Sequence, residues 1–346
     1  MQSTSLRSRS SRTAGCTARA RARTLVVVVA AWIASALTPA FAQSLVLDRT
    51  IALPSVHGRI DHLAVDAQGA RLFVAALGSD SLEIVDLHAG TRVDRITSLH
   101  EPQGVLYLER SNRVVVANGS GGGVLAFLDG KGPATVGQPA LDDADNLRLD
   151  PSTGHVYVGF DKALAALDPE TLQVLRRIDL EAHPESFQIE QSGRRIYVNV
   201  PGVGHVAVID RGSGTVVATW RVEGAARNFP MALDEGGRRL FVATRLPARL
   251  IAFDTESGRQ LDRVPVCGDA DDLFLGGDAH RIYVVCGEGE VDIVRSDDGQ
   301  LTVKERIPTA PGARTGLFVP RLSTLFIAVP ARAGSPAEIR AYTAKQ

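Results

Sequence analysis

The chain has 346 residues, 45% of them hydrophobic, with 38 basic residues, 39 acidic residues and three cysteines. Six arginines lie within the first 24 residues, so the remainder is clearly acidic, with 32 basic against 39 acidic side chains. Nucleic acids and anionic lipid surfaces are bound through basic patches, and this charge balance argues against both as partners.

The first 42 residues have the layout of a secretory signal peptide. They combine an arginine-rich start without acidic residues, an apolar run from Leu25 to about Leu37, and small residues at both key positions of a cleavage site in Ala40-Phe41-Ala42. The apolar run is short for a membrane span, so we expect cleavage; an uncleaved anchor is the alternative. We therefore expect a periplasmic or secreted mature chain that starts near Gln43 and has no membrane-inserted segment.

A four-residue apolar pattern then recurs seven times along the chain. Its copies begin at positions 72, 114, 156, 196, 240, 282 and 325, so that successive starts are 40–44 residues apart. The first copy reads Leu72-Phe73-Val74-Ala75 and the fourth reads Ile196-Tyr197-Val198-Asn199. A fixed period near 40 with short strands is typical of radial repeats. The sequence therefore predicts an all-β, seven-bladed β-propeller over residues 43–346.

Each repeat is expected to contain four strands. In the first repeat, Leu63–Asp66 is the short inner strand, Arg71–Ala75 the second, Ser81–Leu87 the third and Thr91–Leu99 the fourth. The third strand alternates polar and apolar residues, as a strand with one buried face does. Turns with Gly, Asp or Pro precede the fourth strands, because hairpin turns favour these residues.

The last repeat is one strand short. It supplies Leu317–Val319, Leu325–Val329 and Glu338–Thr343, whereas the N-terminal segment Leu45–Leu53 resembles the fourth strands of the other repeats. We therefore expect Leu45–Leu53 to complete the last blade, which would remove a free sheet edge and close the ring. A closed ring needs no second subunit, and we expect a monomer.

The segments that precede the inner strands face the central channel. Aligned on the second strands, one position reads Asp61, Gln103, Asp145, Glu185, Phe229, Asp271 and Thr315, and the next reads His62, Gly104, Asn146, Ser186, Pro230, Asp272 and Gly316. In repeat proteins the shared residues build the fold and the departures carry function. We predict a binding site for a small polar ligand or a protein here, formed by Arg59, Asp61, His62, Gln103, Asp145, Asn146, Glu185, Arg227, Asp271, Asp272 and Arg314.

Two other interpretations of this channel mouth are open. Hard cations such as calcium take carboxylate and amide oxygens, so the cofactor, otherwise unknown, could be one divalent cation. Its candidate ligands are Asp61, His62, Asn146, Glu185 and Asp272. The other interpretation is a solvated polar funnel whose acidic groups accept hydrogen bonds from loop amides.

Two cysteines, Cys267 and Cys286, remain after the expected cleavage. Exported proteins mature in an oxidising compartment, and neighbouring antiparallel strands would bring these two positions together. The sequence therefore predicts one disulfide; two buried free thiols are the alternative. No third cysteine or nearby histidine completes a metal-ligand set.

Several segments resemble a known family. Arg195–Val198 and Arg281–Val284 read Arg-Ile-Tyr-Val, and Asp150–Val158 reads Asp-Pro-Ser-Thr-Gly-His-Val-Tyr-Val. With the period and the leader, these segments resemble the YVTN-repeat, YncE-like family of exported seven-bladed propellers over residues 45–346. The resemblance implies a protein without a defined activity that binds other macromolecules, and it supplies no catalytic motif.

We therefore expect an exported, non-catalytic binding protein or scaffold whose ligand or partner lies at the channel mouth. No Gly-x-Ser-x-Gly elbow is present, and no catalytic residue is assigned. The alternative is a divalent-metal-dependent, lactonase-like hydrolase that uses the channel carboxylates to hold an ion that polarises a carbonyl and activates water. A docking module for an electron-transfer partner is a third hypothesis, which depends on the acidic charge alone.

Overall fold

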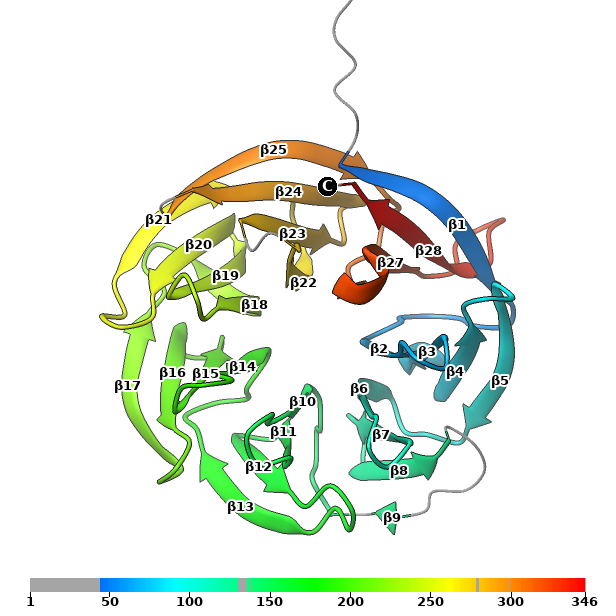
Figure 1. Cartoon of the computed structure of the whole chain (residues 1–346), viewed down its shortest axis with the longest axis horizontal. Helices are drawn as coiled ribbons and strands as arrows, with labels where there is room; N and C mark the ends of the chain where they lie inside the picture. Colours follow the sequence, from blue (N-terminus) through cyan, green and yellow to red (C-terminus); the bar gives the residue numbers. More distant parts are fainter. Residues whose placement is uncertain (1–43, 130–135, 138, 278–279, 298, 346) are drawn as a thin grey trace, which may run out of the picture. The chain divides into compact units, whose positions relative to one another are not determined.

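The computed structural model describes residues 44–129, 136–137, 139–277, 280–297 and 299–345. These residues form seven antiparallel four-stranded sheets, arranged as the blades of a ring (Figure 1). The all-β, seven-bladed propeller predicted from the repeat is therefore confirmed. The expected signal peptide, residues 1–42, lies outside the described residues. Within those residues, no helix has the length and apolar character needed to cross a membrane.

The first four blades follow the chain from the inner strand outward. Blade one contains β2 (Leu63–Asp66), β3 (Arg71–Ala76), the 3-10 helix η1 (Leu77–Ser79), β4 (Ser81–Asp86) and β5 (Thr91–Thr97). Blade two contains β6 (Pro102–Leu108), β7 (Arg113–Asn118), β8 (Val124–Leu128) and β9 (Val136–Gly137). Blade three contains β10 (Leu147–Leu149), β11 (Val156–Phe160), β12 (Ala163–Leu167) and β13 (Val174–Asp179). Blade four contains β14 (Phe187–Ile189), β15 (Arg195–Val200), β16 (His205–Asp210) and β17 (Thr215–Arg221).

The last three blades include the one that closes the ring. Blade five contains β18 (Ala226–Asp234), β19 (Arg239–Leu246), β20 (Ala248–Asp254) and β21 (Gln260–Pro265). Blade six contains β22 (Ala270–Leu275), β23 (Arg281–Cys286), β24 (Glu290–Asp297) and β25 (Gln300–Pro308). Blade seven contains β26 (Gly316–Val319), the 3-10 helix η2 (Pro320–Leu322), β27 (Thr324–Val329), β28 (Ala337–Ala344) and β1 (Leu45–Leu53).

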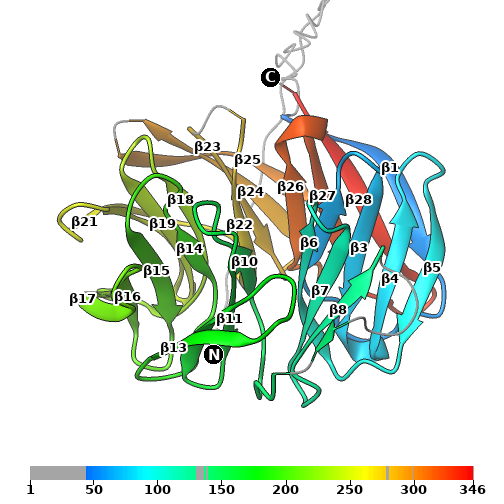
Figure 2. The ribbon, with the colours of Figure 1, turned by 60° about the horizontal axis from the view of Figure 1, so that its bottom comes forward.

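Strand β1 closes the ring as predicted. It lies on the outside of blade seven and pairs antiparallel with β28, from Leu45 opposite Ala344 to Leu53 opposite Ala337 (Figure 2). The two ends of the described chain therefore share one sheet. Inner strands contact one another around the whole channel, including β2 with β26 across the closure.

The apolar core is divided among the interfaces between blades. Successive residues of a strand point to opposite faces, so Phe73 packs toward blade two while Val74 packs toward blade seven. Both side chains are fully buried. This arrangement explains why the second strands are continuous apolar runs: each one is covered by a neighbouring blade on both faces.

The predicted disulfide between Cys267 and Cys286 is present. Both cysteines are buried; Cys267 lies just before β22, and Cys286 is the last residue of β23. The bond links residues separated by 19 positions, and a loop of this size contributes about 3 kcal/mol in the chain-entropy model.

Arginines at the start of four second strands form hydrogen bonds from their own blade to the next one. In each case the guanidinium donates to a backbone carbonyl near the outer part of the following blade. The pairs are Arg71 with Asp129, Arg113 with Glu170, Arg195 with Thr255 and Arg281 with Lys345. The Arg-Ile-Tyr-Val motif therefore combines a buried strand with a contact between blades.

We predict that the closing strand contributes strongly to stability. Ile51 is buried in the interface between blades seven and one, and Ile51→Ala should lower the free energy of unfolding by about 2–4 kcal/mol through lost burial and a residual cavity. Thr50→Ala, at the exposed neighbouring position of the same strand, is the matched control. Chemical denaturation measures both variants, and equal losses would contradict this role of β1.

Candidate functional site

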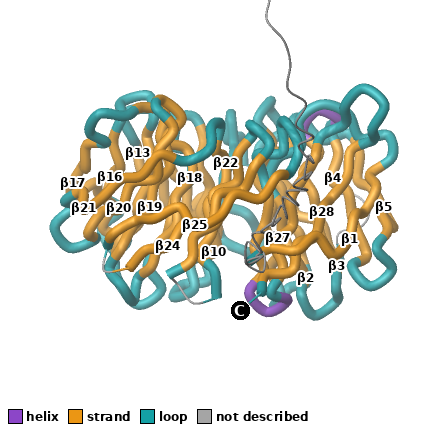
Figure 3. Tube along the Cα trace, turned by 90° about the horizontal axis from the view of Figure 1, so that it is seen from above, coloured by secondary structure: helices purple, strands orange, loops and turns teal. Residues whose placement is uncertain are grey.

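A recurrent backbone turn aims side chains at the channel. In four blades a residue with left-handed φ lies two positions before the member of the predicted ring that begins with Asp61. These residues are Glu101, Asp143, Arg227 and Asp269, with φ between 50° and 60°. In blade seven, Gly312 has a left-handed φ of 84° and lies two positions before Arg314. The backbone turns there and then runs into the inner strand. Loops lie at both ends of the blades (Figure 3).

Blade seven differs by one position from the sequence alignment. The carbonyl of Thr315 accepts the amide of Ala328, just as the carbonyl of His62 accepts the amide of Ala75. Thr315 therefore corresponds to His62, and Arg314 corresponds to Asp61; the alignment of Thr315 with Asp61 and of Gly316 with His62 was wrong. The inner strand of blade seven pairs in the usual register, with Gly316 opposite Ile327 just as Leu63 lies opposite Val74. The error was in the spacing, because Asp61 lies eleven positions before Leu72 whereas Thr315 lies only ten before Leu325.

His62 lies at the centre of the charged residues. Its Nδ1 is 3.5 Å from Oδ1 of Asp272, and its Nε2 is 3.8 Å from Oδ1 of Asp61 and 3.9 Å from Oδ1 of Asp145. These carboxylates come from blades six, one and three, so the histidine connects groups from opposite parts of the ring. Burial opposes protonation of the ring, but the three carboxylates outweigh it and raise the pKa of His62 to about 10.

Two arginines balance the carboxylates of blades one and six. The Nη2 atom of Arg59 lies 2.8 Å from Oδ2 of Asp61 and 3.7 Å from Oδ2 of Asp271. Asp271 also pairs with Arg245, whose guanidinium lies over the ring of Phe229 at 4.0 Å from its centroid. Stacking on an aromatic face and pairing with a carboxylate are the contacts that suit a planar guanidinium.

Three carboxyl groups of this region, those of Asp61, Glu185 and Asp271, have pKa values raised mainly by burial. Burial raises the pKa of Asp61 to about 7, although the positive charges of His62 and Arg59 oppose this shift. Burial, together with the charges of Asp145 and Asp271, raises the pKa of Glu185 to about 8. Because like charges in a poorly hydrated site cannot all ionise, the group carries less negative charge than its residue types suggest.

We call these seven residues the mouth cluster: Arg59, Asp61, His62, Asp145, Glu185, Asp271 and Asp272. Asn146, also predicted, supports it, because its Nδ2 donates to Oδ2 of Asp145 at 3.2 Å. The remaining three candidates contribute no side-chain contact to the mouth cluster among the contacts of the described residues. Arg227 is exposed, Arg314 pairs with Asp269 at 2.9 Å, and the backbone carbonyl of Gln103 accepts the amide of His62.

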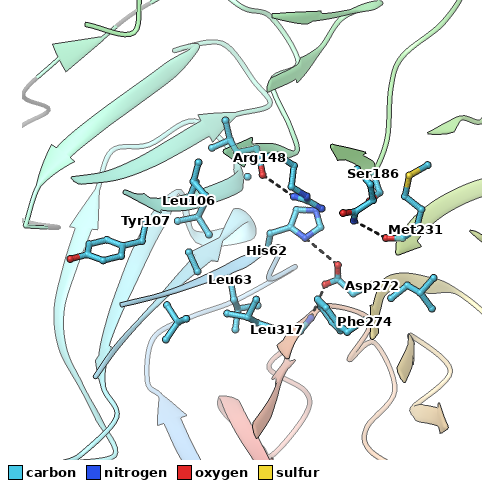
Figure 4. Close-up of a pocket in the computed structure, with 18 residues that line it drawn as sticks. His62, Leu63, Leu106, Tyr107, Arg148, Ser186, Met231, Asp272, Phe274 and Leu317 are labelled. Atoms are coloured by element: carbon cyan, nitrogen blue, oxygen red, sulfur yellow. Dashed lines mark hydrogen bonds and ion pairs between the residues drawn. The ribbon is translucent and has the colours of Figure 1, made fainter. Parts of the chain in front are cut away.

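A cavity of about 350 Å³ lies in the channel next to the mouth cluster. Residues from all seven inner strands or the positions just before them line it, and its charged members are His62, Arg148 and Asp272 (Figure 4). Leu106, Met231, Phe274 and Leu317 are among its apolar members. A concave, mostly apolar space with a few polar groups is the usual form of a small-molecule site, and this volume is within the common range.

Sequence reasoning predicted His62 and Asp272 but missed Arg148 and Ser186, two other polar residues that line this cavity. Arg148 is the second residue of β10, and the equivalent inner-strand positions in the other blades are Ala64, Leu106, Gln188, Ala232, Phe274 and Leu317. A charged residue at a position that is otherwise uncharged was a signal in the alignment. Ser186 appeared there as one member of a ring, and nothing marked its hydroxyl as facing a cavity.

The predicted cation ligands do not assemble as a metal site. Among the described residues, no group of three or more His, Cys, Asp or Glu side chains is placed so that it could hold a metal ion. Of the five candidate ligands, Asp61, His62 and Asp272 interact mainly with one another and with neighbouring donors. The arrangement favours a network of ion pairs within the protein.

Comparisons with known proteins show the fold alone. No protein-family model matches this chain, and no curated protein matches its sequence. Among solved structures, it is similar to a chain described as Kuenenia stuttgartiensis hydrazine synthase, with a TM-score of 0.71 and 15% sequence identity. The match covers 83% of this chain and 98% of that chain.

The mouth cluster predicts a pH dependence of stability. The pKa values of His62, Asp61 and Glu185 are raised above their ordinary values of 6.5, 3.8 and 4.5. The folded state therefore binds more protons than the unfolded state, and stability should fall as the pH rises. We expect the melting temperature to decrease from pH 6 to pH 9.

Asp61→Asn should flatten this decrease, because it removes one titrating carboxyl group and one of the charges that raise the pKa of His62. Asp179→Asn, at a side chain that is 80% exposed, is the control and should follow the unmodified protein. Melting curves in a constant-ionic-strength buffer series measure the effect. A melting temperature that is constant or rises from pH 6 to pH 9 would show that the folded state does not bind more protons in this cluster than the unfolded state does.

Proposed function

We propose that this chain is an exported propeller that binds a small ligand in its central channel and catalyses no reaction. The observation that carries the proposal is the cavity of about 350 Å³, which residues of all seven blades line and which has three charged side chains, His62, Arg148 and Asp272, in its lining. If the channel mouth were only a solvated funnel, its charged side chains would face water and would not form buried ion pairs between different blades. Burying charged groups is costly unless they are paired, and such clusters are typical of functional sites.

Two features support export. The Cys267–Cys286 disulfide is a type of bond that forms and persists in oxidising compartments and is rare in the cytosol. The leader pattern of residues 1–42 points the same way. The YVTN-like, YncE-like motifs agree with a periplasmic binding protein, which we propose to be monomeric and to bind no nucleic acid.

The proposal of a binding protein agrees with the side chains at the channel. In the part of the chain that the structure describes, no Ser, Thr or Cys side chain is hydrogen-bonded to a histidine ring, so the usual nucleophile and base pair is not assembled there. The lactonase-like alternative needs a metal-binding set, and the described side chains provide none. Binding is therefore the function that the geometry supports best.

The test is a ligand screen that compares the unmodified protein with a variant whose channel is filled and with a control variant. Ala64→Phe places a phenyl ring in the cavity at the position that Phe274 occupies in blade six, so the fold should accept it. Val217→Phe adds the same ring on the outer strand β17, where Val217 is 59% exposed. Ligand-observed NMR with a set of anionic, neutral and cationic fragments should give hits that compete with one another and disappear only with Ala64→Phe. Hits that are identical in all three proteins, or no hits in any, would overturn the proposal.

A further inference from the structure

Arg148, which is partly buried, stands out among the charged residues of the channel because its partners are few. Its Nη1 donates to the carbonyl of Leu147 at 2.8 Å, and its guanidinium lies 5.7 Å from the ring centroid of Phe187. No carboxylate of the described residues comes within 4 Å of it. A guanidinium has five N–H donors, and an arginine that is withdrawn from the outer surface is ordinarily paired. Most of the donor capacity of Arg148 is therefore unused and lies at the cavity that the residue lines.

The nearby carboxylates are already engaged with other donors. Oδ2 of Asp272 accepts the amide of Gly316 at 2.8 Å, and its Oδ1 faces His62. Asp145 receives the side-chain amide of Asn146 and also faces His62. These contacts keep Asp272 and Asp145 from neutralising Arg148 by direct contact. Their charges reach it only at longer range, where they oppose the effect of burial, which lowers the pKa of Arg148.

Ser186 supplies a second unused donor at the same cavity. Its side chain is buried to all but 8%, it lines the cavity, and its hydroxyl has no hydrogen-bond partner among the described residues (Figure 4). Its neighbour Gln188 is not free, because Nε2 of Gln188 donates to the carbonyl of Met231 at 3.0 Å. One guanidinium and one hydroxyl from adjacent blades thus line a cavity whose other charged members, His62 and Asp272, interact with each other.

We propose that the channel cavity binds a small organic monocarboxylate, with its carboxylate on Arg148 and Ser186 and its apolar body against Leu106, Met231, Phe274 and Leu317. This inference rests on the proposed function and specifies its ligand class. The planar fork of a guanidinium matches a carboxylate in two parallel hydrogen bonds, which gives both strength and orientation. A single negative charge fits best, because a second one would approach the carboxylates of Asp272 and Asp145.

The experiment compares three probes of similar shape and different charge. Benzoate, benzamide and benzylammonium are titrated calorimetrically into residues 43–346. Benzoate should bind at one site per chain and at least about tenfold more tightly than benzamide, because hydrogen bonds to a charged group are roughly twice as strong as neutral ones. Benzylammonium should not bind detectably. No measurable binding of benzoate, or binding no tighter than that of benzamide, would overturn the proposal.

Variants test the assigned residues. Arg148→Gln should remove the preference for benzoate over benzamide, and Ser186→Ala should weaken benzoate binding while keeping the preference. Arg221→Gln, at an exposed position on β17, removes the same charge elsewhere and should change neither. A preference that survives in Arg148→Gln, with an unchanged melting temperature, would contradict the assignment.

The failure of this inference can be distinguished from the failure of the proposed function. If benzamide or benzylammonium binds as well as benzoate and Ala64→Phe abolishes that binding, the channel is a ligand site but not a carboxylate site. If the Ala64→Phe substitution leaves all fragment binding intact, the channel itself is not the site.

Discussion

The pairing of β1 with β28 is the constraint on which the site depends. Seven blades can surround a narrow channel only if the ring is closed, and here the first described strand closes it on the outside of the last blade. Closure brings β2 next to β26, so that loops from the two ends of the chain face each other. The side-chain hydroxyl of Thr315 donates to the carbonyl of Ile60 across this junction, directly beside the mouth cluster. Charged residues that are more than 200 positions apart therefore meet in one site.

Within the channel, most carboxylates of the mouth cluster have a cationic partner, whereas Arg148 has no carboxylate close to it. His62 pairs with carboxylates from three blades, and Arg59 and Arg245 pair with the remaining acids of blades one and six. Asp61 and Glu185 hold protons more tightly than usual, which further reduces the negative charge. An acidic mouth predicted from residue types thus becomes a largely neutralised network. Among the described residues, Arg148 is a cation of the channel without a close carboxylate, and this favours an anionic ligand over the divalent cation that was one interpretation of the sequence.

Much of the fold could be predicted from the sequence, because it depends on periodic features. The repeat of Leu72-Phe73-Val74-Ala75 revealed the seven second strands, and the segment Leu45–Leu53 was identified as the closing strand with the bounds that the structure shows. The mouth residues could be predicted as a ring, but their pairing could not, since it depends on side-chain directions and distances across the channel. The constant spacing of the repeat would have placed Arg314 at the position of Asp61, because the inner strand of blade seven pairs in the same register as that of blade one. Arg148 could have been found by comparing the inner strands alone, where it replaces residues such as Ala64 and Phe274.

The state of the His62 side chain tests the central claim most directly, because the charge balance of the channel depends on it. Nitrogen-15 NMR of the labelled imidazole ring in residues 43–346 distinguishes the charged from the neutral ring, and His62→Gln assigns the signal. The account predicts that both ring nitrogens carry protons at pH 7.5 and that the ring titrates near pH 10, in line with its raised pKa of about 10. A neutral ring at pH 7.5, titrating at its ordinary value of 6.5 or below, would contradict it. Asp272 and Asp145 would then lack their cation, and Arg148 would no longer be the unmatched charge of the channel.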